Sequence, residues 1–488
     1  MFIDKIKENS LKLRNTVAYV SNNHKLTYGD LWEKSSNLAD YLRNNGEGPV
    51  IIYGHKSPYM IISFLACIIS GRAYVPCDIS FPTARLEYMI LQTKSKTIIA
   101  TEMLELENRA VINSEILIKL CSIKNECPLI YNENNIAYII FTSGSTGTPK
   151  GVSISIKNLD NFINWSTNIL AISSVKNATV FNQAAFSFDL SVADIYISLV
   201  QGHTLFASTH HEQEDLALLF KRLKESNCSL IVCTPTFMQM CLCDCDFNRE
   251  LLPMLKVVFF CGEVLTVKIA QKLTDRFLGI RIINAYGPTE ATCAVIAVEI
   301  TEGMMQKPSL PIGQIDNSAV EISIVDGEKE LSNSVCGEIM LHGASISSGY
   351  LLQKSHSIIS DNYYHTGDIG KIENGFLYYY GRMDEQIKYK GYRIELTEIE
   401  LCINDIDGIA NAVVVPIEGH DDKILMLIAF VRVTKEITSD DIKAELSKKL
   451  PRYMIPKSIL IVDKIPMNQN GKCDRKALKE GFFNGANC

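Results

Sequence analysis

The stretch Tyr138-Ile-Ile-Phe-Thr-Ser-Gly-Ser-Thr-Gly-Thr-Pro-Lys-Gly-Val152 joins an apolar strand to a loop of glycine and hydroxyl residues with one lysine. A loop of this kind can turn its backbone N–H groups toward phosphate oxygens, and Lys150 adds a positive charge. It is not a G-x-x-x-x-G-K-[ST] loop, which would need glycine at Pro149 and Ser or Thr at Gly151. We therefore expect a nucleotide-binding loop of another type rather than a flexible linker. Its hydroxyl donors are Thr142, Ser143, Ser145 and Thr146.

Short apolar runs alternate with longer amphipathic segments on both sides of this loop. Such alternation is typical of βαβ units and predicts mostly parallel sheets. The apolar stretch from Met60 to Ser70 is too short for the ~20 residues of a membrane helix and predicts a buried core helix. The strand-like runs are Val50–Tyr53, Ala137–Phe141, Leu230–Cys233, Val257–Phe260 and Ile280–Ile283, and the helical patterns include Leu31–Asn44 and Glu214–Ser226.

Two later regions depart from this pattern. The first has short strands separated by turn residues such as Asp326-Gly327 and Asn374-Gly375, which predicts a small antiparallel, barrel-like subdomain. After Gly381 the sequence becomes more charged, and strand and helix patterns then recur. We therefore expect an α/β fold with a large domain over residues 1–383 and a small, mobile α+β domain over residues 384–488. The antiparallel strands are expected at Ala319–Val325, Gly337–His342 and Gly375–Tyr380.

The composition excludes several classes of protein. The 488 residues are 47% hydrophobic and 21% charged, as in folded globular proteins. A net charge of -7 provides no overall positive field for nucleic acid or anionic membrane. The N-terminal residues MFIDKIKENS lack the apolar core and cleavage site of a secretory signal, so we expect a cytoplasmic protein. Its 15 cysteines are then expected to be reduced thiols.

The phosphate loop resembles that of the adenylate-forming superfamily, which contains acyl-CoA synthetases, luciferases and the adenylation domains of non-ribosomal peptide synthesis. The resemblance extends over nearly the whole chain and implies activation of a carboxylic acid as its adenylate, followed by transfer to a thiol. The further motifs are Leu26-Thr-Tyr28, Gly71-Arg-Ala-Tyr-Val-Pro76, Phe188-Asp189, Asn284-Ala-Tyr-Gly-Pro-Thr-Glu290, Tyr364-His-Thr-Gly-Asp368, Gly381-Arg-Met-Asp-Glu-Gln-Ile-Lys388, Gly391-Tyr-Arg-Ile-Glu395 and Asn470-Gly-Lys472.

The resemblance implies roles for individual residues. Lys472 would contact the carboxylate and the α-phosphate, Thr289 would touch the α-phosphate, and Glu290 would hold Mg²⁺, which prefers oxygen ligands. Asp368 and Arg382 would bind the ribose, and Tyr286 would lie along the adenine. Asp384 would be the hinge between an adenylation pose and a thioester-forming pose. The implied ATP site comprises Thr142, Ser143, Gly144, Ser145, Thr146, Gly147, Lys150, Asn284, Ala285, Tyr286, Gly287, Asp368, Arg382 and Lys472.

Asp189 decides the expected class of acid. It stands where amino-acid-activating members of the family pair a carboxylate with the substrate's α-ammonium. Fatty-acid and aryl activators have no such cation, and a lone buried carboxylate would cost them several kcal/mol. An amino acid is therefore favoured. The alternative interpretation makes Asp189 the N-cap of the helix that follows it.

The expected lining offers no charge to a substrate side chain, which favours a neutral amino acid. Cys261 and its surroundings resemble the D-alanine-activating branch of the family. Ala193, Ala285 and Cys293 stand where that branch typically has methionine, threonine and valine, and two of these changes remove volume. D-alanine is thus the first expectation and a larger neutral amino acid the second. The expected substrate-binding residues are Asp189, Leu190, Ala193, Val232, Phe259, Cys261, Gly262, Ala285, Cys293 and Lys472.

The expected function is that of a stand-alone amino acid–carrier protein ligase. Since no carrier segment follows Lys472, the acceptor would be the phosphopantetheine thiol of a separate, acidic carrier protein, with Lys390 and Arg393 as candidate contacts. Two alternatives stay open. One is an acyl- or aryl-CoA ligase that uses the same ATP residues. The other is a catalytically silent relative that binds nucleotide as a scaffold or sensor.

Overall fold

The chain packs as two compact units in a computed structural model. The first unit contains Met1–Ile79, Ile90–Ile140 and Gly151–Met383, and the second contains Ser80–Met89, Phe141–Lys150 and Asp384–Cys488. The C-terminal part of the second unit thus begins at Asp384, the predicted boundary, and the unit also includes two segments from the range 1–383 that was predicted to form the large domain. The structure describes residues 1–22, 24–124, 128–129, 132–144, 147–170, 178–327, 329–332, 334–351, 359–360, 363–419, 424–467 and 473–483.

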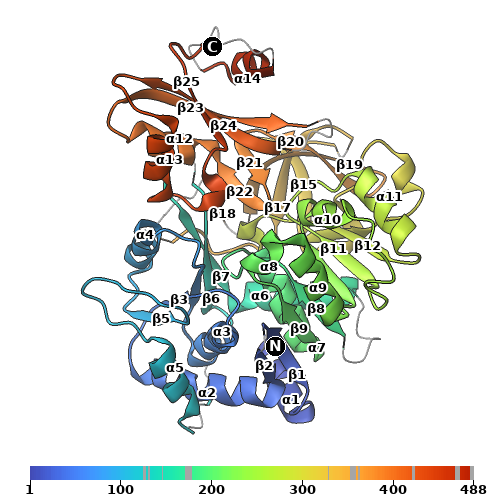
Figure 1. The fold of residues 1–488 in the computed structure, drawn as a ribbon. Helices are drawn as coiled ribbons and strands as arrows, with labels where there is room; N and C mark the ends of the chain where they lie inside the picture. Colours follow the sequence, from blue (N-terminus) through green and yellow to red (C-terminus); the bar gives the residue numbers. More distant parts are fainter. Residues whose placement is uncertain are drawn as a thin grey trace. The chain divides into compact units, whose positions relative to one another are not determined.

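An eight-stranded sheet carries Val232, Phe259 and Ala285, three of the predicted substrate residues, on β10, β11 and β12. Figure 1 shows these strands side by side. The inner strands of the sheet pair in parallel, and the edge pairs β12–β13 and β1–β2 are antiparallel. The central strands β10 and β11 are short, wholly apolar and buried, as expected for a sheet covered on both faces. In spatial order the eight strands are β13 (Ile296–Glu299), β12 (Arg281–Tyr286), β11 (Val257–Phe260), β10 (Leu230–Cys233), β8 (Thr179–Asn182), β9 (Thr204–Ala207), β1 (Val17–Ser21) and β2 (His24–Thr27).

The predicted core helix packs against the strands β3 and β4 of a five-stranded sheet. Helix α3 (Pro58–Ser70) is buried from Met60 to Ile69, which confirms the prediction of a core helix. Ser57 caps its start, Pro58 occupies its first turn, and Gly71 ends it at φ +78°. The strands, in spatial order, are β5 (Thr97–Ala100), β3 (Val50–Tyr53), β4 (Tyr74–Cys77), β6 (Ile136–Thr142) and β7 (Lys150–Ser155).

The helices alternate with these strands as the sequence predicts, with one correction. The pattern at Glu214–Ser226 contains two helices, because Asp215 accepts hydrogen bonds from the N–H groups of Ala217 and Leu218 and so starts a new helix. None of the helices among the described residues has the length and apolar character needed to cross a membrane. The helices are α1 (Phe2–Lys12), α2 (Tyr28–Asn44), α4 (Thr83–Thr93), α5 (Ser114–Ser122), α6 (Ile156–Leu170), α7 (Leu190–Gln201), α8 (His210–Glu214), α9 (Leu216–Ser226), α10 (Pro235–Leu242) and α11 (Val267–Arg276).

The predicted antiparallel subdomain is confirmed as a third sheet of the first unit. Its β19–β20 turn has Asn374 and Gly375 at φ +51° and +80°, the left-handed conformation that a two-residue hairpin turn of type I′ requires. The sheet runs β14 (Gly313–Gln314), β20 (Phe376–Arg382), β19 (Tyr363–Glu373), β17 (Gly337–His342), β15 (Glu321–Asp326) and β16 (Lys329–Glu330), and β18 (Ile359–Ser360) pairs with β19.

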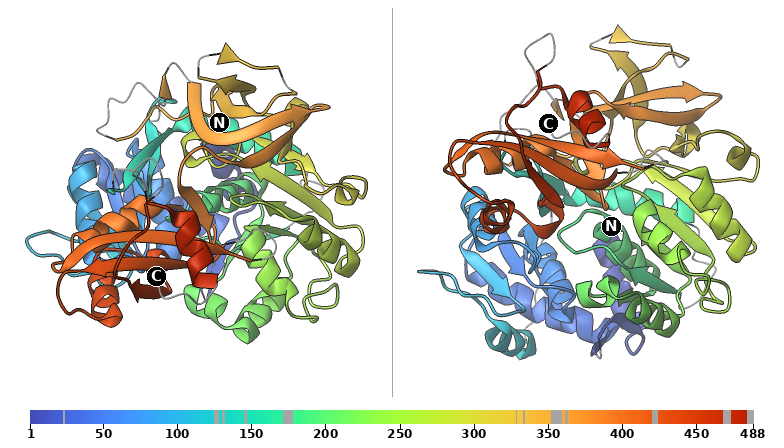
Figure 2. Two further views of the ribbon diagram at one scale, coloured as in Figure 1. Left: turned by 90° about the horizontal axis from the view of Figure 1, so that it is seen from above. Right: turned by 45° about the horizontal axis from the view of Figure 1, so that its top comes forward.

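The second unit contains a three-stranded sheet with helices on both faces. Alternation along β23 places Val414 in one apolar cluster with α12 and α13, whereas Val413 and Val415 lie in another with Leu478 of α14. Figure 2 shows α14 beside this sheet. Its elements are the hairpin β21 (Gln386–Tyr389) and β22 (Tyr392–Glu395), strands β23 (Ile409–Glu418), β24 (Ile424–Val433) and β25 (Ser458–Ile461), and helices α12 (Leu396–Asn404), α13 (Ser439–Ser447) and α14 (Arg475–Phe483).

Candidate active site

Asp189 lies immediately before α7, at the end of the connection that follows β8. Its side chain is 7% exposed and makes no capping hydrogen bond to α7. Instead, its Oδ2 accepts a hydrogen bond of 2.5 Å from the Thr289 hydroxyl. The capping alternative is therefore wrong, and the structure brings Asp189 and Thr289, two of the predicted site residues, together.

Glu290 is buried in the short 3-10 turn η2 (Thr289–Ala291) that follows β12. Its Oε1 accepts a hydrogen bond of 2.7 Å from the Tyr350 hydroxyl, and its carbonyl accepts one from the Ser347 N–H. The Tyr350 contact orients the carboxylate, and the Ser347 contact fixes the backbone that carries it. Mg²⁺ binds carboxylates of this type, usually alongside substrate phosphates.

Asp368 joins two more of the predicted nucleotide residues. Its Oδ2 accepts a 2.6 Å hydrogen bond from the Tyr286 hydroxyl, and its Oδ1 accepts one of 2.6 Å from the Arg382 guanidinium. Burial raises the pKa of Tyr286 well above its usual value, so this phenol stays protonated as a donor. Asn284, another predicted nucleotide residue, makes a separate contact: its side-chain amide donates a hydrogen bond to the Pro311 carbonyl at 2.7 Å.

The apolar residues of the predicted substrate pocket belong to one buried cluster. Strand pairing sets Val232 of β10 beside Phe259 of β11. Gly262 follows β11 at φ +92°, and a methyl group on it would lie 3.8 Å from the Phe188 ring. The cluster includes Leu190, Ala193, Val232, Phe259, Cys261, Ala285 and Cys293.

Two adjacent residues behind η2 have an uncommon backbone conformation. Thr292 and Cys293 have φ values of +62° and +73°, a left-handed conformation that strains side chains other than glycine. The Thr292 hydroxyl donates to the Ser345 carbonyl at 2.8 Å, and the Cys261 thiol lies 3.6 Å from the Cys293 carbonyl oxygen. The surroundings thus fix this turn next to Glu290.

The described part of the phosphate loop lies in the second unit and contacts that unit's own residues. The Ser143 hydroxyl donates to the Arg393 carbonyl at 2.7 Å and accepts from the Glu395 N–H at 3.1 Å. The Gly144 N–H donates to Glu398 Oε2 at 3.2 Å. A carboxylate of the chain therefore lies on one of the amides that the sequence assigns to phosphate binding.

The remaining loop residues have defined places or lie outside the described residues. Thr142 ends β6, Lys150 begins β7, and Gly147, at φ +78°, donates its N–H to the Gly144 carbonyl. Ser145 and Thr146 lie outside the described residues.

Three further predicted residues lie outside this loop. Gly287 lies so close to Ala294 that a side chain on Gly287 would clash with the Ala294 backbone. Asp384 accepts from the Gln386 N–H at 3.2 Å. Lys472 lies outside the described residues.

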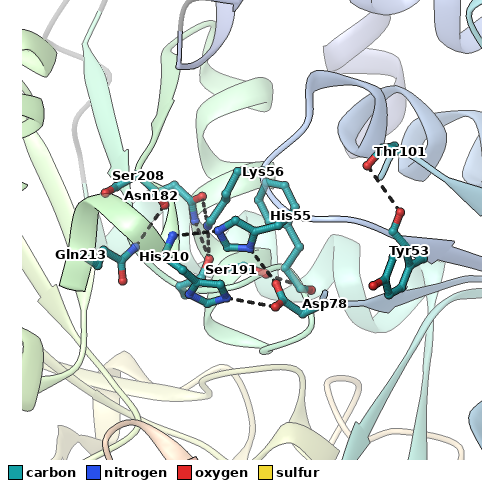
Figure 3. A network of polar contacts seen from close by, with 12 residues as sticks. Tyr53, His55, Lys56, Asp78, Thr101, Asn182, Ser191, Ser208, His210 and Gln213 are labelled. Carbon is teal, nitrogen blue, oxygen red and sulfur yellow. Dashed lines mark hydrogen bonds and ion pairs between the residues drawn. The ribbon is translucent and has the colours of Figure 1, made fainter. Parts of the chain in front are cut away.

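His55, Asp78 and His210 lie close enough together to hold a metal ion, but their side chains are hydrogen-bonded to one another (Figure 3). His55 Nε2 accepts the His210 N–H at 3.0 Å, so its proton lies on Nδ1 and points to Asp78 Oδ2 at 2.7 Å. Burial lowers the pKa of His55, which favours this neutral form. Since Nδ1 carries the proton, it offers no lone pair to a metal ion.

Sequence reasoning did not single out Lys56, Thr292 and Tyr350. Lys56 is a fully buried lysine, Thr292 holds a strained turn, and Tyr350 binds Glu290. Only the surrounding fold reveals these roles, because none of the three residues stands in a motif with a characteristic spacing.

The chain belongs to the AMP-binding enzyme family. Residues 6–351 match the AMP-binding enzyme domain, and residues 398–472 match the AMP-binding enzyme C-terminal domain. Family membership and the names of curated relatives confirm the prediction of an ATP-dependent, AMP-forming ligase.

Among those relatives are two proteins named D-alanine–D-alanyl carrier protein ligase. The one from Bacillus licheniformis is 40% identical, with 98% of this chain and 99% of the relative covered. The one from Listeria monocytogenes serotype 4a is 41% identical, with 93% and 94% covered.

Solved structures confirm the fold. An o-succinylbenzoate CoA synthetase from Bacillus subtilis matches with a TM-score of 0.85 at 18% identity, and 98% of each chain is covered. The Vibrio cholerae adenylation domain AlmE, solved with glycyl-adenosine-5'-phosphate, matches with a TM-score of 0.84 at 22% identity, with 99% and 98% covered.

Proposed function

We propose that this protein activates D-alanine with ATP and transfers it to the phosphopantetheine thiol of a separate carrier protein. The observation that carries the proposal is the buried Asp189 carboxylate, which binds the Thr289 hydroxyl instead of capping α7. The neutral, apolar lining and the two named relatives at about 40% identity support the same substrate class.

In the proposed first step, Asp189 binds the α-ammonium of the amino acid. The Thr289 hydroxyl holds the Asp189 carboxylate in one orientation, which reduces the ordering needed when the substrate arrives. The substrate carboxylate then attacks the α-phosphorus of ATP, and pyrophosphate leaves. In the second step, the carrier sulfur attacks the adenylate carbonyl, and AMP leaves.

The ribose of the nucleotide is proposed to bind Asp368, which is hydrogen-bonded to Tyr286 and Arg382. Asp368 retains lone pairs that can accept the ribose hydroxyls. Glu290 is the proposed ligand of Mg²⁺, which when bound would neutralise charge on the phosphates. Lys472 is the proposed cation on the carboxylate and α-phosphate.

The test is amino-acid-dependent exchange of labelled pyrophosphate into ATP. The panel contains D-alanine, L-alanine, glycine, larger neutral amino acids, fatty acids and benzoates. We expect exchange with amino acids only, highest with D-alanine. Exchange confined to fatty acids or benzoates would make the protein an acyl- or aryl-CoA ligase, and no exchange with any acid would make it a silent relative.

A second assay tests the acceptor. Purified carrier protein with and without phosphopantetheine is incubated with the enzyme, ATP and the best amino acid, and its mass is measured. We expect an aminoacyl mass increase only on the phosphopantetheinylated form. Equal transfer to free coenzyme A would contradict the carrier preference.

A further inference from the structure

Lys56 is a buried lysine in the loop between β3 and α3. It is 1% exposed, and its φ of +52° is uncommon for a residue with a side chain. A buried ammonium is costly unless it is fully hydrogen-bonded, and a strained backbone persists only where its surroundings determine it. The contacts of Lys56 therefore indicate what this loop holds in place.

The Lys56 ammonium has three neighbours, two hydrogen-bond acceptors and one aromatic ring. It donates to the Asn182 side-chain oxygen and to the Ala184 carbonyl, and it lies 4.5 Å from the centre of the Phe186 ring. Figure 3 shows Lys56 reaching Asn182 beside the His55–Asp78–His210 group. The three partners lie at the end of β8 and in the connection to α7.

The same connection ends at Asp189, and its far end is also fixed. Asn182 Nδ2 donates to Asp194 Oδ2 in α7 at 2.6 Å. The Ser191 hydroxyl, also in α7, donates to the Phe188 carbonyl at 2.7 Å. Lys56 thus fixes the start of a seven-residue segment, numbers 183–189, whose last residue is the proposed ligand of the substrate's ammonium.

The charge of Lys56 depends on its surroundings. Burial lowers the pKa of Lys56 to about 7, while Asp194 on α7 and Asp78 after β4 favour the ammonium. The other titratable groups facing this loop are His55, His210 and Tyr19 of β1, whose hydroxyl donates to the Lys56 carbonyl at 2.8 Å. The two acceptors and the ring face match the charged form.

We propose that Lys56 is a positioning residue of the amino-acid site, whose buried ammonium fixes the β8–α7 connection and thereby the orientation of Asp189. The proposal rests on the proposed role of Asp189. Loss of the Lys56 ammonium should therefore weaken binding of the amino acid and leave binding of ATP unchanged.

The test compares Lys56→Met and Lys56→Gln with the wild-type enzyme in pyrophosphate exchange. We expect Lys56→Met to raise the amino-acid KM by about 10- to 100-fold, the effect of losing hydrogen bonds to a charged group, with the ATP KM within about twofold. Lys56→Gln keeps a donor and should recover part of the loss. The control is Lys34→Met, which removes a lysine that lies against the Tyr59 ring on the same unit. Equal increases in both KM values would overturn the proposal.

The pH profile separates positioning from simple loss of stability. In the wild type, the amino-acid KM should rise between about pH 6 and 8 as Lys56 loses its proton, while the ATP KM stays constant. The rise should be absent in Lys56→Gln and retained in Lys34→Met. A wild-type profile without it would refute the proposal even where both Lys56 variants fail to fold. Wild-type enzyme that exchanges pyrophosphate with no amino acid would instead refute the proposed function.

Discussion

At the scale of single residues, Asp189 shows how the structure separates two interpretations of one carboxylate. A helix N-cap and a substrate ligand occupy the same position in the sequence, directly before α7. The side chain makes no bond to the first turn and binds Thr289, which lies 100 residues further along the chain. A local sequence pattern cannot distinguish these two cases, because the deciding partner is distant in sequence.

Replacing Asp189 with Asn tests its charge while keeping its shape. We expect the amino-acid KM to rise about 10- to 100-fold, because a charge-assisted contact to the α-ammonium becomes a neutral one. ATP binding, measured by calorimetry without amino acid, should be unchanged. A matching loss of ATP affinity would point to a structural role for Asp189 instead.

Replacing Lys472 with Ala tests the proposed catalytic cation. We expect pyrophosphate exchange to fall by a few orders of magnitude, because one preorganised charge at the transition state contributes roughly 3–4 kcal/mol. Thermal stability should change little. Lys476→Ala is the matched control, since Lys476 is an exposed lysine of α14 that lies 4.0 Å from Glu480. Exchange at the wild-type rate in Lys472→Ala would remove Lys472 from the mechanism.

At the scale of secondary structure, the elements whose pattern is local were predicted best. Four predicted strands have the same first and last residues in the structure, because polar or turn residues lie close to both ends of each run. They are Val50–Tyr53, Leu230–Cys233, Val257–Phe260 and Gly337–His342. The sequence pattern predicts one helix over Glu214–Ser226, whereas the structure ends one helix at Glu214 and begins another at Leu216. Asp215 caps the second helix, and this role depends on the orientation of its side chain. Sequence periodicity does not encode that orientation.

The candidate site follows the same division. The motif residues Asp189, Thr289, Asp368 and Arg382 meet in pairs in the structure, although their roles toward substrate and nucleotide stay predictions. The sequence does not predict a role for Lys56, because a single lysine outside a motif is usually a solvated surface charge. The burial of Lys56 arises because the loop after β3 packs against the β8–α7 connection, which lies more than 120 residues further along the chain.

Replacing Arg85 with Met tests the pair that anchors α12. Arg85 lies 3.0 Å from Glu398, and the two side chains are 4% and 2% exposed. Removing one partner of a buried pair should lower the free energy of unfolding by about 3–5 kcal/mol, as measured in urea. The double variant Arg85→Met, Glu398→Gln should recover part of this loss, because no buried charge is left unpaired.

The pH dependence of the same variant has a definite sign. Burial raises the pKa of Glu398, whereas Arg85 lowers it. A carboxyl group with a raised pKa in the folded state favours folding at low pH and loses that contribution as pH rises through the raised value. Arg85→Met removes the lowering effect, so the variant should lose more stability at pH 8 than at pH 5. An equal loss at both pH values would mean that Glu398 does not change its protonation state between pH 5 and 8.

At the scale of the whole molecule, the two units each hold part of the proposed machinery. Asp189, Thr289, Glu290 and Asp368 belong to the first unit, and the described phosphate-loop residues belong to the second. Within the second unit, Glu398 accepts the Gly144 N–H that the sequence assigns to a phosphate. An ATP phosphate that binds this amide must therefore displace a carboxylate of the chain itself.

Replacing Asp384 with Pro tests whether the chain acts as a hinge at this residue, where the C-terminal part of the second unit begins. Proline fixes φ near −65° and restricts the residue before it, so a rotation about these torsions should be hindered. We expect pyrophosphate exchange within about threefold of the wild type and transfer to the carrier thiol slowed about tenfold or more, each measured as a separate half-reaction. Asp384→Ala is the matched control, since it also loses the bond to the Gln386 N–H but keeps both torsions free. Because only proline restricts rotation, slowing of transfer in both variants would assign the effect to that hydrogen bond and not to a hinge.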